Sequence, residues 1–283
     1  MADECIHGLE GGLCDQCFPK PAVEVTAPVA KQRATRPTSL RTTPASTKTP
    51  PRTPRTAVRA AAKSVDNVGE QRIYHITHVR NLAGILSSGR LLADASEGWD
   101  DTRPEVDISA PGTRESRRAI LVSGPESPSV ASHVPFFLAP NPRMWDGMRL
   151  GKRDARLSPD ARRAVPADFV MLISTVKTAI ETRPPGEDAI AVADGDAAGK
   201  VTVFGTTPED GERMLRRLRA EEEPAAILDA EFLVLDSFPV ELVTLVGVAN
   251  DKARDEVKAI IAASDFRPKV AVYPPWFQKP EIV

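Results

Sequence analysis

Short apolar runs alternate with polar breaks along the chain from about residue 73 onward. Runs of this length that are bounded by turn residues are typical of β-strands. The segments predicted as strands are 72–77, 133–138, 169–176, 189–193, 201–204, 231–235 and 242–248. The number and spacing of these runs indicate a domain in which strands outnumber helices.

Helical periodicity marks fewer segments. Apolar side chains recur at helical spacing over 79–88, just before a glycine that can end a helix. Two more helices are predicted at 208–220 and 251–263. Residues 94–130 are rich in Gly, Pro, Ser and charge, which predicts a long irregular segment that is either functional or disordered. The pattern therefore predicts a mixed α/β fold of the α+β kind.

A basic stretch separates the N-terminus from the apolar runs. Residues 25–65 carry nine Lys and Arg and no acid, in a chain whose formal net charge is −2. A segment of this composition cannot bury a core, and its prolines favour extended backbone. We therefore predict a cysteine-containing knuckle at 1–19, a disordered basic linker at 20–67 and a globular domain at 68–283.

The three cysteines all lie in the first eighteen residues. Together with His7, the thiols of Cys5, Cys14 and Cys17 supply four ligands, the number that a closed structural zinc site takes. Four protein ligands leave no open position, so such a site would dock a partner or nucleic acid and would not catalyse. The alternative is a disordered N-terminus whose cysteines are incidental.

The chain carries no obvious targeting signal. No window approaches the roughly 20 consecutive apolar residues that a membrane-spanning helix needs. The N-terminus also lacks the charged segment followed by an apolar one that marks a secretory signal. We expect a cytoplasmic protein.

Several polar residues interrupt the apolar runs and are candidates for chemistry. Alternation along the strand at 72–77 puts His75 and Thr77 on one face, where they could line a pocket together. Glu231 opens an otherwise apolar strand, as either a solvated strand end or a catalytic carboxylate. Three arginines in the irregular segment form a solvated cluster or a phosphate clamp: Arg114, Arg117 and Arg118.

Four blocks of sequence resemble, in order, the successive motifs of the DarT-type DNA ADP-ribosyltransferase toxins. The blocks are IYHITHVRNLAGILSSGRLLAD (73–94), HVPFFLAP with Met144 after it (133–144), ADGDAAGKVTVF (193–204) and DAEFLVLDSFP (229–239). The resemblance covers nearly all of the predicted globular domain and none of residues 1–67. It implies a fold of two small packed β-sheets with flanking helices, which holds NAD⁺ in a cleft.

The resemblance also implies roles for individual residues. Glu231 would be the catalytic carboxylate, which stabilises positive charge on the ribose as the nicotinamide bond breaks. The essential arginine of the family precedes the VPF motif, and an ungapped count back from that motif reaches Arg118. Arg117 and Arg114 remain alternatives for that role. The contacts with NAD⁺ would come from His75, Thr77, Asn81, Leu82, Met144 and Arg117.

Three departures from the family pattern bear on the acceptor. Phe137 stands where a tyrosine is usual, and Asp196 stands where His or Asn is commoner. The segment before Glu231 contains three consecutive glutamates at 221–223, which disfavour the approach of a phosphodiester chain. The departures leave the transferase interpretation in place and open the question of what it modifies.

The sequence therefore supports one leading hypothesis and two others. The first is NAD⁺-dependent transfer of ADP-ribose to a base of single-stranded DNA, by the toxin of a toxin–antitoxin pair whose partner is a macrodomain antitoxin similar to DarG. The second keeps the fold and changes the acceptor to RNA or protein. The third is a non-catalytic module that binds NAD⁺ or nucleic acid.

Overall fold

Ten strands form the framework of the part of the chain that the structure describes. The computed structural model describes residues 67–99, 103–152, 154–181, 189–220 and 225–279. The strands are β1 (Arg72–His78), β2 (Arg90–Leu92), β3 (His133–Phe137), β4 (Phe169–Thr175), β5 (Ile190–Ala193), β6 (Phe204–Gly205), β7 (Glu231–Leu235), β8 (Ser237–Pro239), β9 (Leu245–Val248) and β10 (Lys269–Val272). Eight of them form one mixed sheet in the order β10-β9-β4-β1-β3-β7-β5-β6, and β2 pairs with β8.

The eight-stranded sheet consists of two halves of four strands. Strand β1 pairs with β4 over its whole length, from Arg72 opposite Thr175 to the far end. Across the junction, Tyr74 opposite Phe137 is the single register pair that the described residues form between β1 and β3. The resemblance predicts two small packed sheets. In the structure the two four-stranded halves are joined at one pair into a single large sheet, against which the two-stranded sheet packs.

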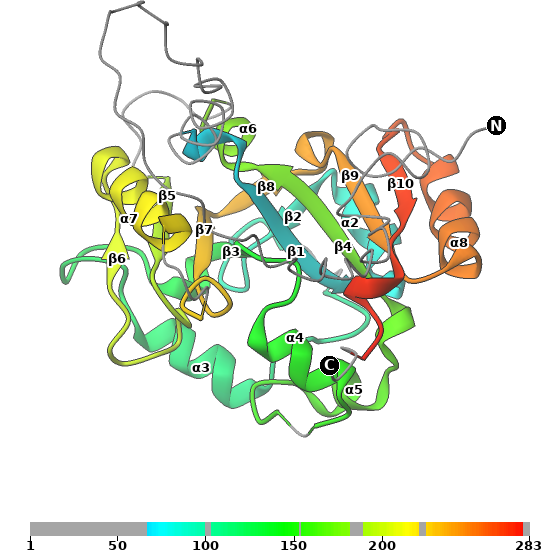
Figure 1. Cartoon of the computed structure of the whole chain (residues 1–283), viewed down its shortest axis with the longest axis horizontal. Coiled ribbons are helices and arrows are strands. Elements are labelled where there is room, and N and C mark those ends of the chain that lie inside the picture. Colours follow the sequence, from blue (N-terminus) through cyan, green and yellow to red (C-terminus); the bar gives the residue numbers. More distant parts are fainter. Residues whose placement is uncertain (1–66, 100–102, 153, 182–188, 221–224, 280–283) are drawn as a thin grey trace, which may run out of the picture. The chain divides into compact units, whose positions relative to one another are not determined.

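Helices flank both ends of this sheet (Figure 1). The helices of the described residues are α2 (Leu82–Ser88), α3 (Pro111–Ala119), α4 (Arg143–Arg149), α5 (Pro159–Arg163), α6 (Val176–Glu181), α7 (Pro208–Ala220) and α8 (Asp251–Ala262). Helix α7 packs beside β5 and β6, and α8 packs beside β9 and β10. The mixed α/β class that the sequence predicts is confirmed.

Local sequence explains where the predicted helices begin and end. The segment predicted at 79–88 starts as a 3₁₀ turn, Val79–Asn81, and continues as α2. Gly89 ends it with φ of 67°, a left-handed conformation that costs glycine little. Helix α8 begins at Asn250, whose side chain accepts a hydrogen bond from the backbone N–H of Ala253.

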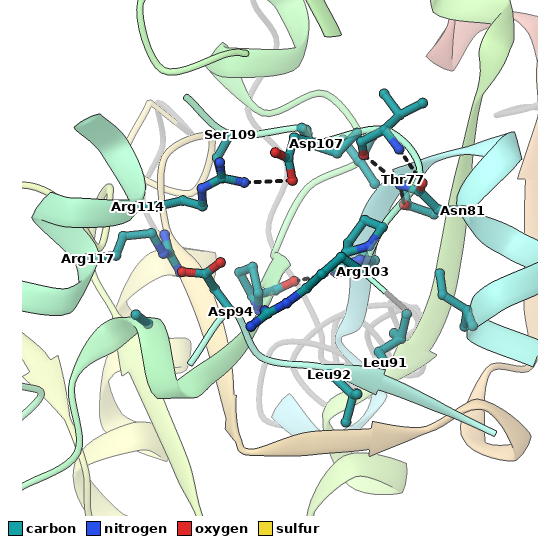
Figure 2. A pocket seen from close by; sticks show the side chains of 18 of the residues that line it. Thr77, Asn81, Leu91, Leu92, Asp94, Arg103, Asp107, Ser109, Arg114 and Arg117 are labelled. Carbon is teal, nitrogen blue, oxygen red and sulfur yellow. Dashed lines mark hydrogen bonds and ion pairs between the residues drawn. The ribbon is translucent and has the colours of Figure 1, made fainter. Parts of the chain in front are cut away.

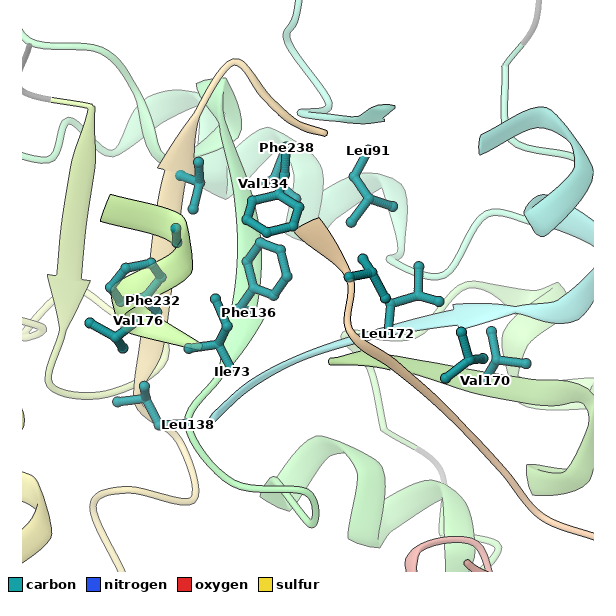
Figure 3. Close-up of a cluster of buried hydrophobic side chains, with 14 of the residues drawn as sticks. Ile73, Leu91, Val134, Phe136, Leu138, Val170, Leu172, Val176, Phe232 and Phe238 are labelled. Atoms are coloured by element: carbon teal, nitrogen blue, oxygen red, sulfur yellow. The ribbon is translucent and has the colours of Figure 1, made fainter. Parts of the chain in front are cut away.

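The core lies on one face of β3 and its neighbours (Figure 3). Val134, Phe136 and Leu138 are buried there because side chains alternate along the strand. Phe238 of β8 packs edge-on against Phe136, with ring centroids 4.8 Å apart. Leu91 of β2 joins the same cluster. The two-stranded sheet is thereby packed against the large one.

Two of the predicted segments are wrong in part. Residues 94–130 contain a helix, α3, where irregular structure was predicted. Its sequence, PGTRESRRA, buries no residue and so has no apolar period to reveal it. Residues 201–204 were predicted as a strand, but pairing is limited to Phe204–Gly205. Val201 is 93% exposed, so this apolar run is not a core strand.

Other predictions fall outside the described residues. These are the cysteine knuckle, the linker up to residue 66 and the acidic segment at 221–223. Within the described ranges, no group of three or more His, Cys, Asp and Glu side chains could hold a metal ion. None of the helices in those ranges is long and apolar enough to cross a membrane.

Candidate active site

A cavity of about 880 Å³ opens beside the junction of the two half-sheets. Strands β1, β3 and β7, helices α2 and α3 and the segment 103–109 all contribute side chains to its lining. Its volume lies within the range of roughly 300–1,000 Å³ that small-molecule and cofactor sites occupy. The cavity is therefore large enough for an elongated ligand.

Strand alternation determines which residues of β3 enter the cavity. His133, Pro135 and Phe137 line it, while the residues between them face the core. Phe137 lies opposite Glu231 in the register of β3 and β7, and paired residues share a face of a sheet. Glu231 therefore enters the cavity from the first position of β7, beside Phe137.

The carboxylate of Glu231 is held by three hydrogen bonds. Arg117 Nη1 donates to Oε1 at 3.2 Å and to Oε2 at 3.0 Å. The backbone N–H of Ala197 donates to Oε1 at 3.0 Å. The Glu231 side chain is only 5% exposed, and the burial of such a charge requires a partner of this kind.

Helix α3 brings three arginines to one wall of the cavity, because positions i, i+3 and i+4 share a helix face. Arg114 binds Asp107 at 2.6 Å, as Figure 2 shows, and Arg118 binds Asp94. Arg117 lies between them and binds Glu231. Each guanidinium is thus paired with a carboxylate from a different part of the chain.

The arginine that the sequence favours is not the one in contact with Glu231. Arg118 is 53% exposed and bonds Asp94 at the edge of the cavity, whereas the Arg117 side chain is 14% exposed. Among the described residues, Arg117 Nη2 is buried without a hydrogen-bond partner. A buried donor left free in this way can serve a ligand. The geometry therefore favours Arg117, one of the two alternatives, for a role at the reacting centre.

His75 and Thr77 both line the cavity, on the strand face that alternation predicts for them. The Nδ1 atom of His75 lies 2.9 Å from the carbonyl oxygen of Pro135. Burial lowers the pKa of His75, so the ring is neutral at pH 7. A carbonyl only accepts, so Nδ1 carries the proton and Nε2 is left as an acceptor. A ligand hydroxyl can donate to that nitrogen.

Asn81 and Leu82 contribute to the site in different ways. Asn81 is buried, and its amide both donates to the carbonyl of Val106 and accepts from its N–H, each at 2.8 Å. It also donates to Thr77 Oγ1 at 3.2 Å (Figure 2). Asn81 therefore fixes the segment around Val106, which lines the cavity. Leu82 is fully buried in the core, and its side chain is absent from the lining.

Charges in the lining almost balance. Seven arginines and six carboxylates face the cavity, which also receives the Met144 side chain. Two of these arginines are not among the residues predicted for the site. Arg103 stacks over Trp99 at 5.2 Å, and Arg156 binds Asp196 at 2.9 Å. The pairing of Arg156 carries no local signal, because Asp196 is forty residues away. The partner of Arg103 is only four residues before it in the sequence.

The geometry agrees with a known family. Residues 74–278 match the model of a family described as "ssDNA thymidine ADP-ribosyltransferase, DarT". The chain belongs to the DarT family. It is accordingly an NAD-dependent ADP-ribosyltransferase, as the resemblance implied, and the matched region spans the whole cavity.

Individual DarT relatives align over most of the domain. A DNA ADP-ribosyl transferase of Thermus aquaticus is 29% identical over 214 residues, which are 73% of this chain and 89% of that protein. The solved structure of Thermus sp. 2.9 DarT in complex with ADP-ribosylated ssDNA has a TM-score of 0.59, at 22% identity over 74% of this chain and 96% of that one. The same protein was solved with NAD⁺, at a TM-score of 0.56 and 22% identity over 74% of this chain and 98% of that one.

A longer DarT protein shares the fold as well. Thermosipho africanus DarTG in complex with ADP-ribose has a TM-score of 0.56 and 16% identity, over 73% of this chain and 51% of that one. At this identity the likeness concerns the fold alone.

Proposed function

We propose that this DarT-family chain transfers ADP-ribose from NAD⁺ to a thymidine base in single-stranded DNA. The observation that carries the proposal is the Glu231 carboxylate, buried in a cavity of about 880 Å³ and fixed by three hydrogen bonds. A carboxylate fixed in advance can stabilise charge that develops during reaction without reorganising. The family description supplies the acceptor base.

In this proposal Glu231 acts on both reacting partners. The bond between the ribose C1 atom and nicotinamide breaks, and positive charge develops on the ribose that the carboxylate stabilises. Thymidine has one ring N–H, and its nitrogen attacks the ribose carbon. Glu231 is the group placed to take the proton released from that nitrogen. Nicotinamide leaves with the electron pair of the broken bond.

We assign the role of essential arginine to Arg117. Its Nη1 orients the Glu231 carboxylate, and its free Nη2 donor is available to a phosphate or a base carbonyl. Arg118 and Arg114 would bind phosphates of NAD⁺. Each can exchange its carboxylate partner for a phosphate group.

The remaining contacts with NAD⁺ follow from the cavity lining. His75 would accept a hydrogen bond from a ribose hydroxyl, with Thr77 beside it. Asn81 and Leu82 would act through the backbone that they hold in place. Met144 would supply an apolar contact to NAD⁺ from the cavity lining. Each of these roles rests on placement and on the family resemblance.

Two features outside the cavity complete the proposal. The chain acts as the toxin of a toxin–antitoxin pair with a macrodomain antitoxin, a proposal supported by the DarTG protein whose fold it shares. The four N-terminal ligands Cys5, His7, Cys14 and Cys17 bind zinc, a proposal supported by their spacing.

The test is an incubation of the purified chain with radiolabelled NAD⁺ and matched single-stranded oligonucleotides. One oligonucleotide contains thymidine and its control has deoxycytidine at every such position. Label is expected on the first oligonucleotide only, sensitive to nuclease and resistant to protease, and absent with Glu231→Gln. Label on RNA or on polypeptide would replace the proposed acceptor, and no transfer to any of them would leave a binding module.

A further inference from the structure

The loop between β5 and β6 touches the reacting centre through a single backbone group. The N–H of Ala197 donates to Glu231 Oε1 at 3.0 Å. The Ala197 side chain is fully buried in a small apolar cluster with Ala193 and Leu233. The position of the loop at this residue therefore decides where one oxygen of the Glu231 carboxylate lies.

Asp196 organises the loop around Ala197. Its Oδ1 accepts from the N–H of Ala198 at 2.9 Å. Its own carbonyl accepts from the N–H of Gly199 at 2.7 Å and from the hydroxyl of Thr202 at 2.6 Å. A Cβ at Gly199 would lie 2.9 Å from that carbonyl, so the turn closes tightly on Asp196. A displacement of Asp196 would carry the Ala197 N–H with it.

Arg156 holds Asp196 from across the cavity lining. Its Nη1 donates to Asp196 Oδ2 at 2.9 Å. The rest of the guanidinium is anchored on Asp154, with Nη2 at 2.7 Å from Oδ2 and Nε at 3.1 Å from Oδ1. Hydrogen bonding by Arg156 keeps the pKa of Asp154 below its usual range, so that anchor is a charged pair at neutral pH. The backbone carbonyl of Arg156 also accepts from the N–H of Ala110 at 2.7 Å, so Arg156 links the loop to the start of α3.

We propose that Arg156 is a positioning residue of the transferase reaction, which acts through Asp196 to hold the Ala197 N–H against Glu231. The proposal rests on the proposed catalytic role of Glu231. Because a displacement of about 1 Å at a reacting group can cost up to about a hundredfold in rate, a residue two contacts away can control turnover. Arg156 in this role changes kcat and leaves the binding of the acceptor unchanged.

A direct contact between Arg156 and DNA is the competing explanation. The Arg156 side chain is 34% exposed and lines the cavity, and arginine binds phosphate well. Such a contact would be lost with Arg156→Met whatever residue occupies position 196. If Arg156 only positions Asp196, Arg156→Met should not lower kcat further in a chain whose residue 196 no longer accepts from the guanidinium. The two explanations therefore differ in how the substitutions combine.

The experiment is a double-mutant cycle with Arg156→Met, Asp196→Asn and the double variant, measured on the full chain. Asparagine keeps an oxygen that can accept from Ala198 and removes the charged acceptor for Arg156. Steady-state transfer to a thymidine oligonucleotide gives kcat and KM. Each single variant is expected to lower kcat about tenfold to a hundredfold, with the KM for oligonucleotide within about twofold of wild type. The double variant is expected to match the worse single variant.

Two further variants serve as controls. Arg156→Lys keeps the charge and should retain more activity than Arg156→Met. Arg163→Met removes an arginine from an exposed pair with Asp160 and is expected to leave kcat unchanged. Thermal unfolding of each variant verifies that the protein is folded.

Two results would overturn the inference. They are multiplicative losses in the double variant, and wild-type kcat in Arg156→Met whether or not its KM for oligonucleotide is raised. Failure of the proposed function would look different, because the unsubstituted chain would then leave no label on the thymidine oligonucleotide. Failure of the role proposed for Glu231 would leave transfer intact in Glu231→Gln.

Discussion

The pair between Arg117 and Glu231 predicts a large difference between two adjacent arginines. Arg117→Met leaves the Glu231 carboxylate buried with one backbone N–H as its remaining donor. Removal of one partner from a buried pair costs about 3–5 kcal/mol. Arg118→Met breaks a pair in which the arginine is more than half exposed, so solvent limits the loss to about 0–1 kcal/mol.

Urea unfolding at pH 7 measures both variants. With an m-value of about 2–3 kcal/mol per molar urea for a domain of this size, Arg117→Met should lower the midpoint by about 1–2 M. Arg118→Met should lower it by less than about 0.5 M. Methionine and arginine have similar helix propensity, so helix α3 itself contributes little to the difference.

A second substitution isolates the cause. The double variant Arg117→Met/Glu231→Gln removes the uncompensated charge together with its partner. It should regain at least about 2 kcal/mol relative to Arg117→Met alone. The reasoning is refuted if Arg117→Met lies within about 1 kcal/mol of wild type, or if the double variant is less stable than the single one.

Three other predictions follow from the structure. Asn81→Ala leaves both backbone groups of Val106 without their partner, so we expect a stability loss of about 1–3 kcal/mol in urea and a raised KM for NAD⁺. Burial lowers the pKa of His75, so the native state resists its protonation. The contribution of neutral His75 to the free energy of unfolding should be fully present above the usual histidine pKa of about 6.5. It should be lost as the pH falls toward the lowered pKa of the folded state. Unfolding curves of His75→Gln should depend less on pH in that range. Metal analysis of the purified chain should find about one zinc per molecule, and a Cys14→Ser/Cys17→Ser variant should have none.

The strands of the sheet were largely predictable, and the reason is physical. β1, β3, β4, β5 and β7 are apolar because they lie inside the sheet, so short apolar runs in the sequence mark them. Helix α3 was not predictable, because all of its side chains face solvent or the cavity and none enters the core. A helix whose function is to carry charge leaves no hydrophobic pattern.

From the sequence, the catalytic role proposed for Glu231 follows only through the resemblance. The position of the proposed essential arginine follows only to within a few residues. Adjacent positions on a helix point about 100° apart, so an error of one residue exchanges a buried contact for an exposed one. Arg117 bonds Glu231 and Arg118 does not, although an ungapped count favours Arg118. The role of Arg156 carries no local signal, because its partner Asp196 is forty residues away in the chain.

The cavity lies where it does because of a proline inside the sheet. The carbonyl of Pro135 accepts from the His75 ring, so it points toward β1. In an extended strand the N–H of a residue points the same way as its carbonyl, and proline has no N–H to donate. The ladder between β1 and β3 therefore ends after Tyr74 and Phe137, and the His75 ring bonds the carbonyl that the ladder leaves free. The sequence VPF thus opens the sheet beside Glu231, which makes this proline part of the site although it does no chemistry.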